Sequence, residues 1–132
     1  MKIAVASDDE ARISQHYGRA PYYVIVTVED GKIISKETRR KAGHQTFAAH
    51  EPAKLAPGER HGYDPGSQSR HAIMVEEIRD CQVLLIGGMG WGAYEAMKSY
   101  GIEPIATDIR DIDEAIKMYL NGKLLNLMER LH

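Results

Sequence analysis

Residues 14–23, with the sequence Ser-Gln-His-Tyr-Gly-Arg-Ala-Pro-Tyr-Tyr, gather several chemically useful side chains between two apolar runs. His16 offers an imidazole that can bind a metal, and Arg19 offers a guanidinium that can hold an anion. Gly18 lies between them and gives the backbone a flexible joint. These residue types predict a metal or anion site. The alternative is a polar loop in which His16 caps a neighbouring element and Arg19 is solvated.

A second candidate is the glycine-rich run at residues 87–92, with the sequence Gly-Gly-Met-Gly-Trp-Gly. It precedes a predicted helix, so Gly87, Gly88 and Gly90 could bring backbone amides close to an anion at the helix N-terminus. The run has neither the lysine of a GxxxxGK[ST] loop nor the glycine spacing of a GxGxxG motif. A tight strand-to-helix turn with Trp91 packed nearby is the other interpretation.

Hydrophobic patterning predicts the elements that position these loops. Five strands are expected, at residues 3–6, 22–28, 32–38, 82–86 and 104–107. Asp30-Gly31 is typical of a tight hairpin, and the charged third strand is expected at a sheet edge. Helices are expected from residue 67 to 81, at 93–100, and from Asp111 to Gly122, followed by one or two helical turns within 124–131. Apolar spacing in the first helix places Cys81 in the core.

This order of elements predicts an α/β protein with a mixed five-stranded sheet of order 3-2-1-4-5, in which strand 2 is antiparallel. Helices on both faces would make a three-layer α/β/α arrangement. The parallel strands 1 and 4 end at the same edge of the sheet, which brings the His16 loop to the glycine run. We expect residues 1–132 to form one domain with a long loop at about 39–66.

Composition narrows the range of functions. The 17 Lys and Arg residues balance 19 Asp and Glu residues, so no global field attracts nucleic acid or an anionic membrane. One cysteine excludes an intrachain disulfide and a cysteine-built metal cage, and it suits a cytoplasmic location. No apolar run has the length of a membrane span, and no signal peptide is expected. Loop histidines 44, 50, 61 and 71 match no zinc-ligand spacing, so no zinc site is assigned.

Residues 14–23 resemble the S-x-H-F-G-R-A-P-Y-F signature of the dinitrogenase iron-molybdenum cofactor biosynthesis domain family. Residues 80–90, 93–97, 101–104 and 107–115 resemble the second half of that family, including its small stand-alone members. The resemblance implies a ribonuclease H-like fold and a non-catalytic carrier of an iron-molybdenum-sulfur cluster or its precursor. It implies that His16 is the metal ligand, beside Gly18 and Arg19. Cluster donor and acceptor proteins are the implied partners, and we expect a monomer or a weak homodimer.

Two other functions remain open from the sequence. A metal-dependent nuclease or phosphohydrolase of the same fold would use Asp8, Asp9 and Asp108 to hold magnesium, although the fourth strand ends in glycines where a carboxylate would be useful. Alternatively, a regulatory domain could bind a protein partner through the long loop. The second alternative leaves the His16 motif without a role.

Overall fold

The computed structural model describes residues 1–41 and 74–132. Five strands, two α-helices and two 3-10 turns make up most of the described chain. They are β1 (Lys2–Ser7), η1 (Tyr17–Arg19), β2 (Tyr22–Glu29), β3 (Lys32–Arg40), β4 (Val83–Ile86), α3 (Trp91–Ser99), β5 (Glu103–Ala106), α4 (Ile112–Leu120) and η2 (Met128–Arg130). A short helical turn at residues 74–76 precedes β4.

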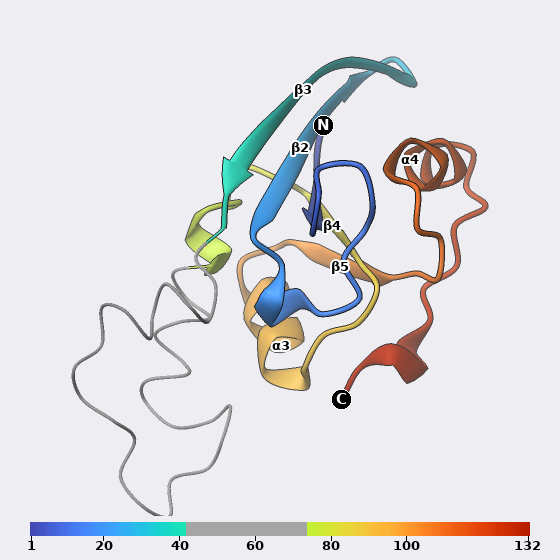
Figure 1. Cartoon of the computed structure of the whole chain (residues 1–132). Helices are drawn as coiled ribbons and strands as arrows, with labels where there is room; N and C mark the ends of the chain where they lie inside the picture. Colours follow the sequence, from blue (N-terminus) through green and yellow to red (C-terminus); the bar gives the residue numbers. More distant parts are fainter. Residues whose placement is uncertain (42–73) are drawn as a thin grey trace, which may run out of the picture.

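The strands form one mixed sheet of order β3-β2-β1-β4-β5, as predicted. Strand β2 is antiparallel to β1 and β3, whereas β1, β4 and β5 run parallel to one another. Asp30 and Gly31 both have positive φ and close the β2–β3 hairpin, which leaves β3 at the sheet edge (Figure 1). The carboxyl ends of β1 and β4 therefore lie side by side, and the two loops of interest leave the sheet there.

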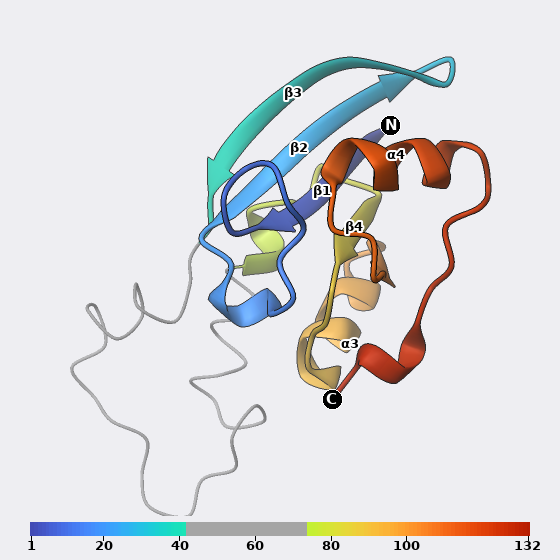
Figure 2. The same cartoon turned by 45° about the vertical axis from the view of Figure 1, so that its right-hand side comes forward.

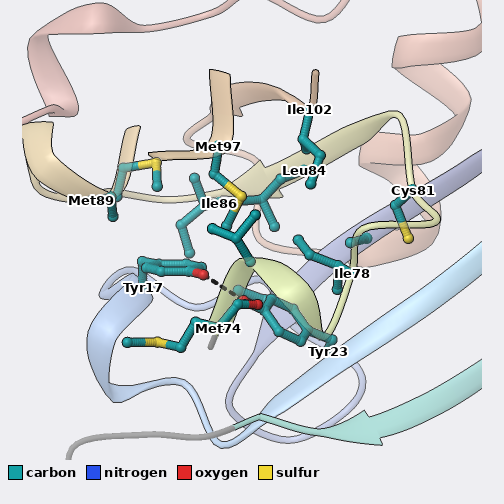
Figure 3. Close-up of a cluster of buried hydrophobic side chains, with 14 of the residues drawn as sticks. Tyr17, Tyr23, Met74, Ile78, Cys81, Leu84, Ile86, Met89, Met97 and Ile102 are labelled. Carbon is teal, nitrogen blue, oxygen red and sulfur yellow. Dashed lines mark hydrogen bonds between the residues drawn. The ribbon is translucent and has the colours of Figure 1, made fainter. Parts of the chain in front are cut away.

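Apolar side chains cover both faces of the sheet, so the fold has three layers. On one face, alternate residues of the strands pack against Ile78 and against Met97 of α3. Figure 3 shows this cluster, which includes the buried Cys81 expected from the sequence. On the other face, Ile112 and Ile116 of α4 pack against the opposite strand residues, and Figure 2 shows α4 over that face.

Strand β3 is longer than predicted, because Arg39 and Arg40 continue the pairing with β2 instead of opening the long loop. Arg39 is held there by hydrogen bonds from Nη1 and Nη2 to the carboxylate of Asp80, at 2.8 and 2.9 Å. The prediction of a loop beginning at residue 39 is therefore wrong by two residues. The rest of that predicted loop and the start of the predicted helix at residue 67 lie outside the described residues.

The tail after α4 also differs from the prediction of helical turns within 124–131. Only the 3-10 turn η2 forms there, because the residues just before it make hydrogen bonds with β5. The side chain of Asn126 accepts from the amide of Ala106 at 3.0 Å, and the amide of Leu127 donates to the Ala106 carbonyl at 2.8 Å. Leu131 is buried in the same core cluster as Met97 of α3, so the tail packs on its own domain.

The helices in the described part of the chain are all too short or too polar to cross a membrane.

Candidate functional site

The two loops that the sequence singled out meet at the carboxyl edge of the sheet. The amide of Gly87 donates to the carbonyl of Ser14 at 2.8 Å, and the amide of Tyr17 donates to the carbonyl of Gly88 at 3.0 Å. In Figure 2 the η1 turn lies beside the chain that leads from β4 into α3. Main-chain hydrogen bonds therefore fix the position of the His16 loop against the glycine run.

This close approach explains why residues 87 and 88 are glycines. A Cβ atom on Gly87 would lie 2.5 Å from Nε2 of Gln15, and a Cβ atom on Gly88 would lie 2.8 Å from the Gln15 carbonyl oxygen. Any larger residue at position 88 would have to push backbone atoms apart. The glycines thus serve packing within the protein, and the Gly87 amide is already occupied by Ser14.

A cavity of about 300 Å³ opens between the loops. It is lined by Gln15, His16, Gly87, Gly88, Glu129, Arg130, Leu131 and His132. Three of the six candidate residues, His16, Gly87 and Gly88, therefore line the cavity. Residues 129–132 of the tail also line it, which the sequence did not lead us to expect. In Figure 1 the C-terminus lies next to the start of α3.

His16 is exposed and lies at the N-cap position of η1. Its main chain is held by Ser14, whose hydroxyl donates to the His16 carbonyl at 3.1 Å and accepts from the His16 amide at 3.2 Å. The imidazole makes no capping hydrogen bond with η1. The backbone is thus fixed, and the exposed residue lines the cavity, which is a suitable arrangement for a metal ligand.

The other three predicted residues do not line the cavity. Gly18 and Arg19 are exposed in η1, one turn beyond His16, and a Cβ atom on Gly18 would meet nothing within 4 Å. Gly90 is the N-cap of α3, and a Cβ atom there would lie 3.4 Å from the carbonyl oxygen of His132. The amide of Trp91 donates to that same oxygen at 3.0 Å, so the first amide of α3 already has an acceptor.

Sequence reasoning missed Gln15, Arg130 and His132. Arg130 donates from Nη1 to Oε1 of Gln15 at 3.0 Å and to the carbonyl of Gly87 at 3.3 Å. Gln15 is the neighbour of His16, so it could have been suspected. Arg130 and His132 belong to no motif and are more than 110 residues from His16, so only the folded chain reveals them.

Tyr17 anchors the His16 loop in the core. It is 3% exposed, and its hydroxyl shares a hydrogen bond with that of Tyr23, which donates to the carbonyl of Met74 (Figure 3). Burial raises the pKa of both phenols well above the usual range, so both remain protonated. Nζ of Lys41 lies 4.4 Å from the centre of the Tyr17 ring, and burial lowers the pKa of Lys41 to about 8.

In the part of the chain that the structure describes, neither the single cysteine nor the carboxylates form a metal site. Burial raises the pKa of Cys81 to about 12, so its thiol stays neutral. Within residues 1–41 and 74–132, no three His, Cys, Asp or Glu side chains are grouped so that they could hold a metal ion. Asp8, Asp9 and Asp108 thus do not form a carboxylate cluster. Asp9 instead accepts from the amides of Ala11 and Arg12, and these bonds lower its pKa.

The fold and the site define an α/β protein with a cavity between loops at the carboxyl edge of a mixed sheet. Residues 1–122 match the family described as Dinitrogenase iron-molybdenum cofactor, and the chain belongs to this family. Membership associates the chain with binding or biosynthesis of that cofactor. The uncharacterized protein MJ0580 of Methanocaldococcus jannaschii is 32% identical over 124 residues, which span 94% of this chain and 89% of that protein.

Solved structures show the same fold. The crystal structure of PH0822 has a TM-score of 0.64 and 26% identity, and the match covers 94% of this chain and 92% of that chain. The apo form of the orange protein from Desulfovibrio gigas has a TM-score of 0.64 and 17% identity, with 96% of this chain and 92% of that chain covered. At that identity the second likeness concerns the fold alone.

Proposed function

We propose that this protein is a non-catalytic carrier that binds an iron-molybdenum-sulfur cluster, or a precursor of it, in metallocluster biosynthesis or storage. The cluster is cargo, and His16 is its metal ligand. The observation that carries the proposal is the exposed His16 imidazole at the rim of a cavity, on a backbone fixed by Ser14 and by the neighbouring glycine run.

The groups at the cavity fit a preassembled cluster. Such a cluster has its own bridging sulfides and a net negative charge, so the protein needs to supply an exchangeable ligand and N–H donors rather than four thiolates. The residues that line the cavity include His16, with its imidazole, and Arg130, with its guanidinium. The side chain of Gln15 holds Arg130 in place through Oε1, while its Nε2 is buried against Gly87.

The cavity is formed by two loops and the tail at one edge of the sheet, so a bound cluster would remain partly exposed. Partial exposure supports exchange with a donor and an acceptor protein, as expected of a carrier. A cytoplasmic location and a monomer or weak homodimer belong to the same proposal, and so does the ribonuclease H-like classification of the fold.

Anaerobic reconstitution tests this function. The protein is incubated with an isolated iron-molybdenum-sulfur cluster, desalted, and analysed for iron and molybdenum by elemental analysis and for cluster absorption. We expect stoichiometric binding by the unchanged protein and a large loss with His16→Ala, because the charge and the N–H donors cannot replace a coordinate bond.

The stability of His16→Ala provides the control. His16 is exposed, so the free energy of unfolding should change by less than about 0.5 kcal/mol. Arg79→Ala, a change in an exposed arginine before β4, should bind like the unchanged protein. Equal cluster binding by the unchanged protein and by folded His16→Ala would refute the role of His16, and no binding by either would refute the carrier function.

A further inference from the structure

The tail after residue 122, where the family match ends, forms one wall of the cavity. Its backbone is bound to the glycine run, since the amide of His132 donates to the carbonyl of Met89 at 3.0 Å and the His132 carbonyl accepts from Trp91. Leu131 pairs with Met89 in a parallel bridge and is buried. The backbone that follows Arg130 is therefore fixed against the glycine run.

Arg130 is partly buried, and among the described residues no carboxylate forms an ion pair with it. Both of its hydrogen bonds leave from Nη1 and go to neutral acceptors, Oε1 of Gln15 and the carbonyl of Gly87. No ion pair joins it to a carboxylate in the described part of the chain, although Glu129 lines the same cavity. Arg39 is different, because two carboxylates accept from its guanidinium. An arginine has five N–H donors, so Nε and Nη2 of Arg130 retain three for a guest.

Arg130 also determines which way the amide of Gln15 is turned. Because Oε1 accepts from Nη1, the Gln15 side chain must present Nε2 as a donor in the other direction. That nitrogen is buried and has no acceptor. Arg130 thus places one positive charge and three N–H groups without acceptors beside the cavity, whereas Nε2 of Gln15 is buried against Gly87.

We propose that Arg130 is the guanidinium that recognises the anionic face of the guest, by donating to the sulfide or oxide ligands of a metal anion. The tail is then part of the binding site, and His132 lines the same cavity as His16. Arg19 does not fill this role, because it is exposed in η1 outside the cavity lining. This inference rests on the proposed carrier function for the identity of the guest, but the anion site itself does not.

Binding by variants of the full chain tests the assignment. The probes are the isolated iron-molybdenum-sulfur cluster and, separately, inorganic molybdate. We expect Arg130→Ala to weaken binding of both by about tenfold or more, and Arg130→Lys to give an intermediate value because it keeps the charge but loses the fork. Arg19→Ala and Arg79→Ala should have smaller effects. Glu129→Gln should tighten binding, because it removes a negative charge from the cavity lining.

A purely structural role for Arg130 predicts a different pattern. In that case Gln15→Ala would weaken binding as much as Arg130→Ala, and the salt dependence of binding would be the same in all variants. If Arg130 faces the guest, the affinity of the unchanged protein should fall with NaCl between about 0.05 and 0.5 M, and Arg130→Ala should show a shallower fall. Gln15→Ala should keep the steeper dependence.

The outcomes separate this inference from the carrier function. Cluster binding that is lost in His16→Ala but unchanged in folded Arg130→Ala would overturn the role of Arg130 and leave the carrier function standing. Molybdate binding that depends on Arg130, without any cluster binding, would support the anion site and refute the carrier function. If neither probe binds the unchanged protein, both proposals are wrong.

Discussion

The amide of Tyr17 donates to the carbonyl of Gly88 at 3.0 Å, and this bond joins two loops that are about half the chain apart in sequence. On the Tyr17 side, the phenol is buried against Tyr23 and holds the loop in the core. On the Gly88 side, the same residue has no room for a side chain. The position of His16, which precedes Tyr17, is therefore set by packing on both loops, before any guest is bound.

Gly88→Ala should disrupt this junction. The new Cβ atom would lie 2.8 Å from the carbonyl oxygen of Gln15 and 3.3 Å from that of Arg130, and both are backbone atoms. We expect a loss of about 1–3 kcal/mol in the free energy of unfolding, together with weaker cluster binding, measured by denaturant unfolding and anaerobic titration. Gly18→Ala is the matched control, because its Cβ atom would meet nothing within 4 Å. An equal effect of the two substitutions would contradict the packing argument.

The protein should become more stable in mildly alkaline solution, because the buried amine of Lys41 then loses its charge. Burial lowers the pKa of this amine from 10.5 to about 8, with a partial opposing effect of Glu77. Between these values the unfolded chain binds a proton that the folded chain does not, so stability increases with pH. We expect a rise of about 1 kcal/mol per pH unit from pH 8 to 9, measured by urea unfolding.

Other buried groups limit this rise and give it a recognisable shape. The pKa of Cys81 is raised from 9.0 to about 12, so above pH 9 the unfolded chain loses a proton that the folded chain keeps, and stability falls. Tyr17 and Tyr23 act in the same direction above pH 10. Lys41→Met should remove the rise between pH 8 and 9, whereas Lys98→Met, at an exposed position on α3, should retain it. A rise that persists in Lys41→Met would assign it to another group.

The sheet could be predicted from the sequence because its determinants are local. Each strand has its own β-branched or apolar run, the Asp30-Gly31 turn specifies the hairpin, and the handedness of crossovers then fixes the strand order. The cap of α4 is equally local, since Asp111 accepts from the amide of Glu114 at 2.9 Å. The meeting of the His16 loop and the glycine run followed from that topology.

The tail could not be predicted in this way because its partners are distant. Its leucines have helical spacing, yet Leu125 is 72% exposed and Asn126 uses its side chain to bind the edge of β5. Local periodicity does not record such hydrogen bonds. Gly88 and Gly90 signalled that something approaches closely, but the sequence does not say that the approaching atoms are the carbonyls of Arg130 and His132. For that reason the four lining residues of the tail, 129–132, could not be predicted from the sequence.

Asp80 should stabilise the protein at neutral pH and lose this effect in acid. Its carboxylate accepts from Nη1 and Nη2 of Arg39 and from Nζ of Lys2, the last at 3.1 Å. The bonds from Arg39, and secondarily the bond from Lys2, lower the pKa of Asp80 well below its ordinary value of 3.8. The folded chain therefore stays ionised where the unfolded chain takes up a proton, so stability is present above pH 4 and falls as the pH decreases.

Asp80→Asn tests this prediction by comparison with the unchanged protein. The carboxylate is partly exposed, so the difference at pH 7 should be only about 1 kcal/mol, in the range of surface ion-pair networks. The difference should begin to shrink as the pH falls below about 4 and should vanish only below the lowered pKa of Asp80, where the unchanged protein also carries a neutral group at position 80. Asp108→Asn, at an exposed position after β5, is the matched control for the removal of one carboxylate. If the gap between Asp80→Asn and the unchanged protein stays constant down to pH 2, the loss at neutral pH does not come from the charge of Asp80, and the junction of β3 with the residues before β4 must be held by other contacts.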